Sequence, residues 1–343
     1  MEASLASFRT QFREALLALL WRQWSALGVA GHAQTGDGRL IDPEALLLFS
    51  TSVARHDARL FDEILDWLQT NGAWINLQRL ARIQNEHHVG DDSILAAIAS
   101  QLTRGHSHPK WRAVARRAPK RACDALLRPL FPHLPVVGQG DEAWLEWGWQ
   151  RSPVELRGLS QAPRPDQPAT FLFKLRALFG RQARVEIIAW LLAHESGHPA
   201  EIARATGYFR GSIQAVLNEL VVSGHVFAVR TSREKRFTLR RDEWRFLLTW
   251  SGDSAPTFPR WLPWPAIFGL MRRVDELLSH PELDRMSPPV QAIELDRATA
   301  PAAAALTPAG LWPAPSAGLV GAASVRATTL RLEALLRQIS PTP

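Results

Sequence analysis

The sequence predicts a mainly α-helical protein that carries a small β-hairpin. Apolar residues recur at spacings of three and four in segments such as EALLLF and RVEIIAWLLAH, which is typical of helices. Two short apolar runs, HVFAVR and RFTLR, flank the polar turn TSREK, which is typical of a hairpin. The chain has 343 residues, of which 46% are hydrophobic and 21% charged, so it is long enough for two or three packed domains.

Changes in composition divide the chain into six predicted segments. The first part has helical apolar spacing, the next is rich in proline, and the run ATAPAAAALTPAGLWPAPSAGLVGAA is of low complexity. The segments are a helical N-terminal domain at 1–128, a proline-rich connection at 129–169, a compact unit at 170–245, a helical extension at 246–297, a flexible linker at 298–323 and an amphipathic helix at 324–343. We expect this last helix either to pack back or to pair with another chain.

The compact unit has the pattern of three helices and a basic hairpin. The first helix is RQARVEIIAWLLAHE, and the second, HPAEIARATGY, is opened by Pro199 and closed by Gly207. The third, RGSIQAVLNELVV, has a narrow apolar stripe and stops before Gly224. Helix, short helix, helix and hairpin in this order predict a winged helix-turn-helix.

The outward side of the third helix is polar. Its inward positions hold Ile, Val and Leu at spacings of three and four, and the outward positions carry no carboxylate; they are Arg210, Ser212, Gln214, Ala215 and Asn218. Gln and Asn can bond bidentately to adenine, and Arg to guanine. We therefore expect this side to read base edges.

The stretches EIARATG, SIQAVLNELVVSGHV and the basic hairpin resemble the winged-helix transcriptional regulators, broadly the bacterial MarR and ArsR families. The likeness covers roughly a fifth of the chain. It implies that the third helix enters the major groove of double-stranded DNA, that the hairpin, or wing, touches the backbone or minor groove, and that the protein is a homodimer on a near-palindromic site. The implied DNA-binding residues are Arg210, Ser212, Gln214 and Asn218 of the helix and Arg230, Arg233, Lys235 and Arg236 of the wing.

Positive charge is concentrated in two parts of the sequence. The whole chain carries +7, with a pI near 10.5. Residues 170–241 contain twelve Lys or Arg and five Asp or Glu, and residues 104–128 contain eight cations and one acid, Asp124. Two basic surfaces favour a polyanionic partner, and Trp111 in the second block is a candidate for stacking on a base. Arg enrichment is equally compatible with a GC-rich genome.

A second, degenerate winged-helix unit is predicted 152 residues before the first. LFDEILDWLQTNGAWINL aligns with SIQAVLNELVVSGHVFAV, so that Gly72 falls on Gly224 and Trp74 begins the counterpart of the first strand. Its exposed positions would hold Asp62, Glu63 and Asp66, which repel phosphate, so we expect this copy to pack or to hold a protein partner. Any amphipathic helix followed by a glycine and a strand would align equally well.

One motif imitates a zinc protease. HESGH, from His194 to His198, matches H-E-x-x-H, in which two His one turn apart hold the metal. That chemistry needs an unbroken helix, whereas Gly197 weakens a helix and Pro199 displaces the residue before it from helical geometry. We therefore expect no catalytic residues, no metal and no cofactor.

The single cysteine, Cys123, excludes an intramolecular disulfide and a cysteine-based zinc cage, and it favours a reducing, cytoplasmic location. The start, MEASLASFRTQFREALLALLW, mixes charges into its apolar pattern, unlike a signal peptide. No apolar run reaches the length that crosses a bilayer.

These observations predict a non-enzymatic, sequence-specific DNA-binding transcriptional regulator, a repressor or autoregulator that acts as a dimer by occupying an operator. The alternative is a protein-interaction module, antitoxin-like or defence-associated, whose N-terminal half holds a partner protein.

Overall fold

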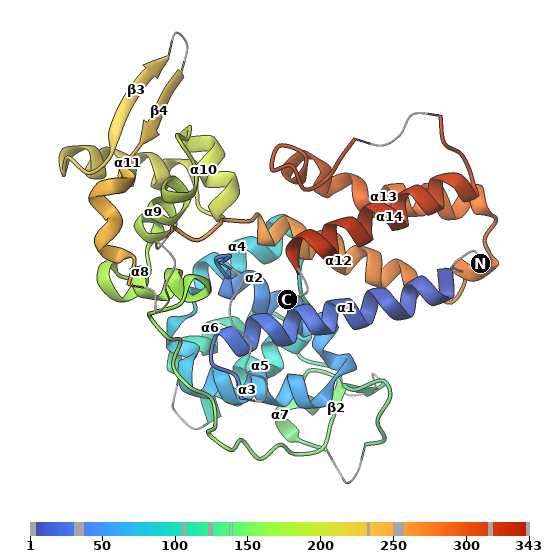
Figure 1. Ribbon diagram of the computed structural model, residues 1–343. Helices are drawn as coiled ribbons and strands as arrows, with labels where there is room; N and C mark the ends of the chain where they lie inside the picture. The colour runs from blue at the N-terminus through green and yellow to red at the C-terminus, as the bar shows by residue number, and fades with distance from the viewer. Residues whose placement is uncertain are drawn as a thin grey trace.

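The computed structural model describes most of the chain, and it is mainly helical with small sheets (Figure 1), as the sequence predicts. The described residues are 5–30, 38–104, 108–122, 126–136, 138, 140–231, 234–249, 257–314 and 318–340. Three residues named above, Cys123, Asp124 and Arg233, lie outside them.

Helices dominate the part before residue 170, and acidic or amide side chains begin several of them. Asp42, Asp57 and Asn76 each accept hydrogen bonds from backbone N–H groups in the first turn of the helix that follows. The helices are α1 (Leu5–Ala26), α2 (Pro43–Val53), α3 (Ala58–Asn71), α4 (Leu77–His87), α5 (Asp92–Arg104), α6 (Arg112–Ala115) and α7 (Glu142–Leu145), with 3₁₀ turns η1 (Ala54–His56), η2 (Gly72–Trp74) and η3 (Pro109–Trp111).

The proline-rich connection contains little regular structure. Strand β1 (Arg128–Pro129) pairs in parallel with β2 (Trp149–Gln150), and the short α7 lies between them in sequence, where DEAWLEWGW predicts a helix. The connection ends at the 3₁₀ turn η4 (Pro168–Thr170).

The predicted compact unit contains α8 (Phe171–Phe179), α9 (Ala183–Ala193), α10 (Pro199–Thr206), α11 (Arg210–Val222), β3 (Phe227–Thr231), β4 (Glu234–Thr238) and the 3₁₀ turn η5 (Arg241–Leu247). Strands β3 and β4 form an antiparallel hairpin in which Thr231 is opposite Glu234. This hairpin projects from the rest of the molecule, above α11 in Figure 1.

The C-terminal helices are longer than the sequence predicts, and the prediction of a flexible linker at 298–323 is wrong over its first part. After α12 (Trp264–Leu278) and η6 (Leu283–Arg285), α13 runs from Pro288 to Leu306. Ala302, Leu306 and Trp312 are buried. The alanine-rich run forms a helix because alanine has the highest helix propensity and its small side chain allows close packing. The last helix, α14 (Ala322–Ile339), packs back against α13 and α1.

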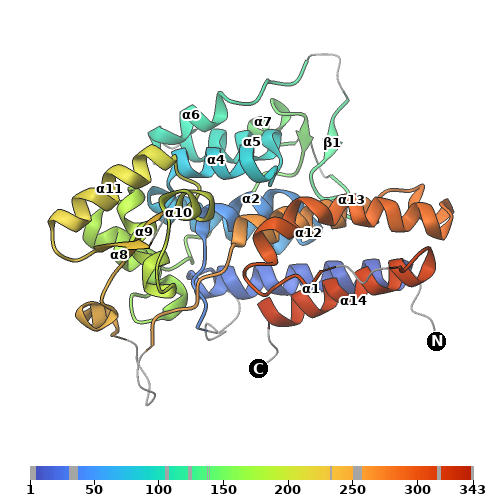
Figure 2. The ribbon, with the colours of Figure 1, turned by 90° about the horizontal axis from the view of Figure 1, so that it is seen from above.

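The described residues form two large hydrophobic cores and one small cluster between α13 and α14, and the largest core joins the two ends of the chain. Buried residues of α1 and α2 share it with Phe268 of α12 and Leu335 of α14. Figures 1 and 2 both show α1, α12, α13 and α14 side by side. The second core, with Ile188, Ile213 and Phe237, belongs to the unit from α8 to η5. The unit from α8 to η5 is therefore an insertion in the chain. The helices before it, α1 to α7, and after it, α12 to α14, share the first core, and we call them the helical body.

A buried cluster of charges connects the inserted unit to the helical body. Glu44 of α2 is fully buried, and Arg176 of α8 donates to both of its carboxylate oxygens at 2.8 Å. Arg176 also donates to Glu186 of α9 at 2.7 Å. Arg79 of α4 donates to Asp42 at 2.7 Å and to Glu44 Oε2, which also accepts from Arg176, at 2.6 Å.

Backbone and amide groups complete this charge cluster. Arg79 donates from Nε to the carbonyl of Thr206, at the end of α10, at 2.7 Å. Asn76 donates from its backbone N–H to Glu44 at 2.7 Å and from Nδ2 to the Tyr208 hydroxyl at 2.8 Å. Burial raises the pKa of Tyr208, as does the negative charge of Glu186, so the hydroxyl keeps its proton.

The degenerate second winged-helix unit is not formed, because its strand is absent. Where the alignment places a strand after Gly72, the chain makes the turn η2 and then α4. Asn76 caps α4 by accepting from the backbone of Gln78 and Arg79. An Asn at this position favours a helix start, and this cap outweighs the likeness in the apolar spacing.

The acidic face predicted for that copy is covered by the chain itself. Glu63 and Asp66 are buried, and Asp66 accepts from the backbone N–H groups of Gly158 and Ser160 at 2.6 and 2.9 Å. Asp62 pairs with Arg151 at 2.8 Å, and Glu63 pairs with Arg157. Asp62, Glu63 and Asp66, which suggested a protein partner at the N-terminal half, therefore bind the segment 151–160 of the same chain.

Within the described residues, no helix combines the length and the apolar character needed to cross a bilayer.

We expect Arg176→Met to reduce the free energy of unfolding by about 3–5 kcal/mol, because it leaves Glu44 and Glu186 buried without their cation. Arg297→Met is the matched control, since Arg297 forms an exposed pair with Glu294; its effect should stay within about 0.5 kcal/mol. Urea unfolding followed by circular dichroism measures both. Equal effects of the two substitutions would show that the buried cluster does not hold the structure.

The buried cluster also predicts a dependence of stability on pH. Burial raises the pKa of Glu44, but Arg176 and Arg79 oppose it and hold the pKa at about 2, below the ordinary 4.5. The stabilisation from ionised Glu44 is therefore complete above pH 4.5 and is lost as the pH falls toward 2. Glu44→Gln should lower the melting temperature at pH 7 and flatten its decline between pH 5 and 3, whereas exposed Glu86→Gln should not. Parallel melting curves of parent and Glu44→Gln across this window would contradict the assignment.

Candidate nucleic-acid interface

Helices α9, α10 and α11 and the hairpin β3–β4 assemble around a tight backbone contact at Gly197. Gly197 forms an isolated antiparallel bridge with Phe237 of β4, with N···O distances of 2.8 and 2.9 Å. A Cβ on Gly197 would overlap the ring of Trp190 and lie 2.9 Å from Ile202 Cδ1. The turn between α9 and α10 thus adds a third short extended segment beside the hairpin, and it needs a glycine.

The ends of α10 set the angle at which α11 follows. His198 caps α10 with its Nδ1 accepting from Ala200 N–H, and Glu201 accepts from the His198 N–H. Gly207 ends α10 with φ at +73°, a left-handed conformation that favours glycine. The buried residues Ile213 and Leu217 then hold α11 on the second core.

Helix α11 presents most of the predicted reading residues to solvent. Arg210, Ser212 and Asn218 are exposed and Gln214 is half-buried. Gln214 Nε2 donates to Asn218 Oδ1 at 3.1 Å, so the two amides lie together on one side of the helix. In Figure 2, α11 lies at the edge of the molecule.

The expectation of a carboxylate-free face on α11 is wrong. Glu219 is exposed, and at seven residues after Ser212 it lies on the same side of the helix. Arg184 of α9 donates to Glu219 at 2.6 Å, which offsets its charge. Glu219 is therefore a neutralised edge of the reading face.

The wing carries two cations directly opposite each other. Arg230 of β3 and Lys235 of β4 are cross-strand partners and both are exposed. Lys235 Nζ lies 5.0 Å from the centre of the Phe237 ring, so its stem follows the apolar base of the hairpin. Neither cation has an ion pair among the described residues. The predicted Arg233 lies outside the described residues.

Arg236 is held by other residues of the unit. It donates to Glu201 of α10 at 2.9 Å and to the Ser196 hydroxyl and carbonyl at 3.0 and 3.1 Å. These bonds tie β4 to the start of α10, so Arg236 positions the wing instead of standing free for phosphate.

The second basic block forms an exposed surface around η3 and α6. The exposed cations of η3, of α6 and of the residues directly after α6 that have no ion-pair partner among the described residues are Lys110, Arg112, Arg116 and Arg117. Arg128, at the end of the block, is also exposed and lies over the Trp149 ring. Trp111 is 1% exposed and donates from Nε1 to the Gly72 carbonyl, so the prediction that it stacks on a base is wrong. The indole is used in packing because η3 turns it inward.

The HESGH motif does not lie on one helix. Helix α9 ends at Ala193, and His194 stacks on Trp190 with ring centres 3.9 Å apart. His198 is the N-terminal cap of α10. No group of three metal-ligating His, Cys, Asp or Glu occurs among the residues that the structure describes.

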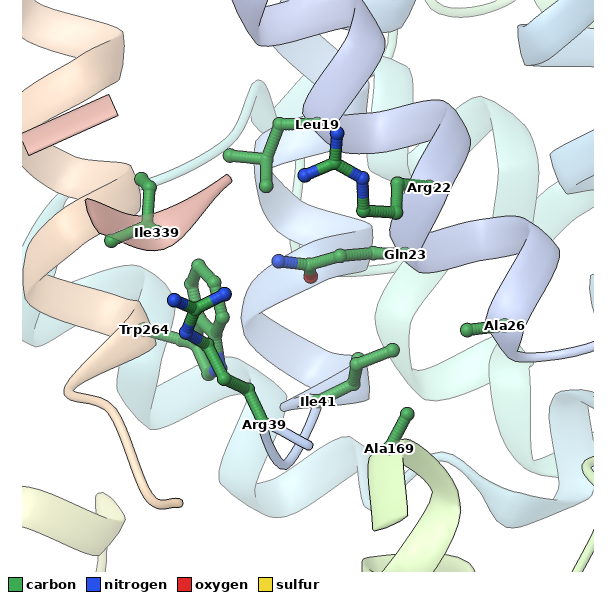
Figure 3. A pocket seen from close by; sticks show the side chains of 9 residues that line it. All are labelled: Leu19, Arg22, Gln23, Ala26, Arg39, Ile41, Ala169, Trp264 and Ile339. Carbon is green, nitrogen blue, oxygen red and sulfur yellow. The ribbon is translucent and has the colours of Figure 1, made fainter. Parts of the chain in front are cut away.

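A pocket near the end of α1 is too small for a substrate. Figure 3 shows Gln23 extending toward Arg39 and Trp264 in this pocket. Its volume is about 20 Å³, close to the space that one water molecule needs. Both amide atoms of Gln23 lack a hydrogen-bond partner within the described structure, which suits a site for one water molecule.

Comparisons with protein-family models, with curated proteins and with solved structures find no match to this chain.

We expect Gly197→Ala to destabilise the protein by about 1–3 kcal/mol, because the added methyl group forces Trp190 and Ile202 apart. Gly211→Ala is the matched control: nothing lies within 4 Å of a Cβ there, and in helix α11 alanine should stabilise by about 0.5–1 kcal/mol. Thermal unfolding measures both. A Gly197→Ala protein as stable as the parent would contradict the tight contact between this turn and β4.

Proposed function

We propose that the protein is a sequence-specific, double-stranded DNA-binding transcriptional regulator without catalytic activity, and that α11 reads bases while the wing contacts the backbone. The observation that carries this proposal is the pairing of an exposed polar helix with an adjoining hairpin that bears two exposed, unpaired cations. Helix–short helix–helix–hairpin with a bridge from Gly197 to β4 is an arrangement that suits this role.

The side chains of α11 suit the edges of base pairs. Asn218 and Gln214 each offer an amide that can bond bidentately to adenine, and Arg210 offers a guanidinium that suits guanine. The hydrogen bond from Gln214 to Asn218 orders these two amides in the free protein. This order lowers the entropy loss that DNA binding must offset.

The cations support backbone contact. Arg230 and Lys235 of the wing and the exposed surface of Lys110, Arg112, Arg116 and Arg117 would release counterions on contact with phosphates. Affinity should therefore fall steeply with salt. The resemblance to winged-helix regulators extends the proposal to a homodimer that acts as a repressor or autoregulator on a near-palindromic operator.

Base reading and backbone contact are separable by substitution. Asn218→Ala should weaken binding to the preferred duplex by about 1–3 kcal/mol and to random duplexes much less. Lys235→Ala and Arg230→Ala should weaken both alike and lower the salt slope by about one unit each. Electrophoretic titration between 50 and 200 mM salt measures these effects. Over this range the affinity of the parent should fall by about a thousandfold if some six phosphates are contacted.

Arg297→Ala is the control for this experiment, because Arg297 is an exposed arginine of α13, which lies away from the wing (Figure 1). It should change neither affinity nor salt slope. If Asn218→Ala and Gln214→Ala bind every duplex as the parent does, or if affinity ignores salt, the proposal fails.

A protein-interaction module, antitoxin-like or defence-associated, is the second candidate. Large apolar side chains stand exposed on and beside α11: Phe209 is 67% and Val222 is 90% exposed. Phe209 precedes the first residue of α11 and Val222 is its last residue, so both side chains are accessible to a protein partner. Val222→Asp should abolish binding of such a partner and leave duplex binding unchanged. Lys235→Ala should weaken duplex binding and leave binding of the protein partner unchanged.

A further inference from the structure

The motif DEAWLEWGW contains three buried tryptophans whose ring N–H groups differ in their partners. Trp144, Trp147 and Trp149 are 0%, 5% and 1% exposed. Trp144 Nε1 donates to Gln101 Oε1 and Trp149 Nε1 donates to Ser93 Oγ, each at 2.9 Å. Trp147 Nε1 has no hydrogen-bond partner in the described part of the chain. Because a buried donor without an acceptor is costly, this N–H indicates a place for an acceptor that the described residues do not supply.

Trp147 lines a pocket of about 420 Å³ on the helical body. Helices α6 and α7 lie beside α5 in Figures 1 and 2, and the pocket is formed by residues of α5 and α6 and of the turns that follow α6 and α7. The polar lining residues that matter here are Ser100 of α5, Arg112 and Arg116 of α6 and its C-terminal end, and Glu146 at the C-terminal end of α7. The volume lies in the range of small-molecule sites.

The pocket has a surplus of positive charge. Arg112 and Arg116 are exposed, and neither has an ion-pair partner among the residues that the structure describes. The N–H of Arg116 donates to the Arg112 carbonyl, so the two residues are one helical turn apart and lie on the same side of α6. The third cation of the lining, Lys120, pairs with Glu146 at 3.3 Å. Three cations and one carboxylate give the described lining a net charge of +2.

We propose that this pocket binds the terminal phosphate group of a phosphomonoester. Such a group carries a charge of about −1.5 to −2 at pH 7 and three acceptor oxygens. One oxygen can accept from Trp147 Nε1 while the others accept from the guanidinium groups of Arg112 and Arg116, which form strong, charge-assisted hydrogen bonds with phosphate. One ligand then supplies the missing acceptor and offsets the surplus of positive charge.

A phosphomonoester matches the pocket better than a carboxylate or a phosphodiester does. Each of these alternatives has two free oxygens and a single negative charge, which offsets only half of the net charge of +2. A phosphodiester is also continued by its chain on two sides, whereas the buried ring of Trp147 is reached more easily by the free end of a ligand. The inference requires no DNA and does not rest on the proposed function.

Binding is tested by nuclear magnetic resonance of the full chain labelled with nitrogen-15, in which each tryptophan ring N–H gives its own signal. The probes are methyl phosphate, which is a phosphomonoester, and dimethyl phosphate, which is the matched diester. We expect methyl phosphate to shift the Trp147 signal saturably, with an affinity at least about tenfold higher than that of dimethyl phosphate. The signals of Trp144 and Trp149 are internal controls and should shift far less, because their N–H groups already have acceptors.

Substitutions test the three donor groups separately, with the phosphorus-31 signal of methyl phosphate as the measure of affinity. Trp147→Phe keeps an aromatic ring and removes the N–H, so it identifies the Trp147 signal and should weaken binding by about tenfold. Arg112→Gln and Arg116→Gln should each weaken binding by about tenfold. Arg117→Gln is the matched control, since Arg117 is an exposed arginine of the same basic block outside the pocket lining; it should bind methyl phosphate as the parent does.

A Trp147 signal that methyl phosphate does not shift, or equal affinity of Arg116→Gln and Arg117→Gln, would overturn the proposal. Dimethyl phosphate or a duplex without terminal phosphates that shifts this signal as tightly as methyl phosphate would also overturn it, because the pocket would then bind phosphodiesters. If Trp147→Phe does not fold, the Trp147 signal is assigned through the backbone of the parent, and the arginine variants decide the outcome.

Discussion

The structure depends on one buried carboxylate, Glu44, and the two arginines that neutralise it. Arg176 comes from the inserted unit and Arg79 from the helical body, so Glu44 joins the two cores through charge. Buried charges are costly unless each is paired and hydrogen-bonded. Here both oxygens of Glu44 are shared between the arginines and the Asn76 amide. Because a shifted arrangement would leave some of these groups unpaired, the cluster favours a single orientation of the unit.

This constraint matters for the proposed function because Glu44 and Arg176 fix the unit that carries α11 to the helical body. The chain enters the unit after the proline-rich connection and leaves it before α12, and the helices on either side share a core. Arg79 holds the end of α10 through the Thr206 carbonyl, and Arg236 holds the wing through Glu201. In the proposed complex with DNA, a helix and a wing fixed in this way would lose little entropy on binding.

Local signals in the sequence predict much of the inserted unit. Pro199 and Gly207 mark the ends of α10 correctly because proline suits the first turn and glycine suits a left-handed end. The alternation of apolar and polar residues predicts the hairpin. By contrast, the prediction of a degenerate second winged-helix unit is wrong. A helix followed by a glycine and apolar residues does not specify a strand, and the Asn76 cap favours the start of helix α4 at this position. The linker prediction fails at α13 because low complexity in an alanine-rich run is compatible with a buried helix.

The charge cluster and the interface details depend on contacts between distant residues, which local patterns do not reveal. Glu44 in EALLLF and Arg176 in FLFKLRALF are each a charge within an apolar helix. Such a charge indicates that an oppositely charged residue is buried beside it, but the sequence does not show which residue that is. Glu219 and Arg236 are ordinary charges in the sequence, and only the fold brings them to Arg184 and Glu201. The exposed position of most candidate residues on α11 could thus be predicted from the sequence, whereas the ion pairs of Glu219 and Arg236 could not.

We propose that α11, held on the helical body, reads DNA sequence. Selection of bound duplexes from a random-sequence pool, performed in parallel with the parent chain and with Asn218→Ala, tests it most directly. We expect the parent to enrich one motif and the variant to enrich the same motif with relaxed preference at one or two adjacent positions. A parent that enriches no motif, or a folded variant that enriches the parent motif unchanged, would contradict it.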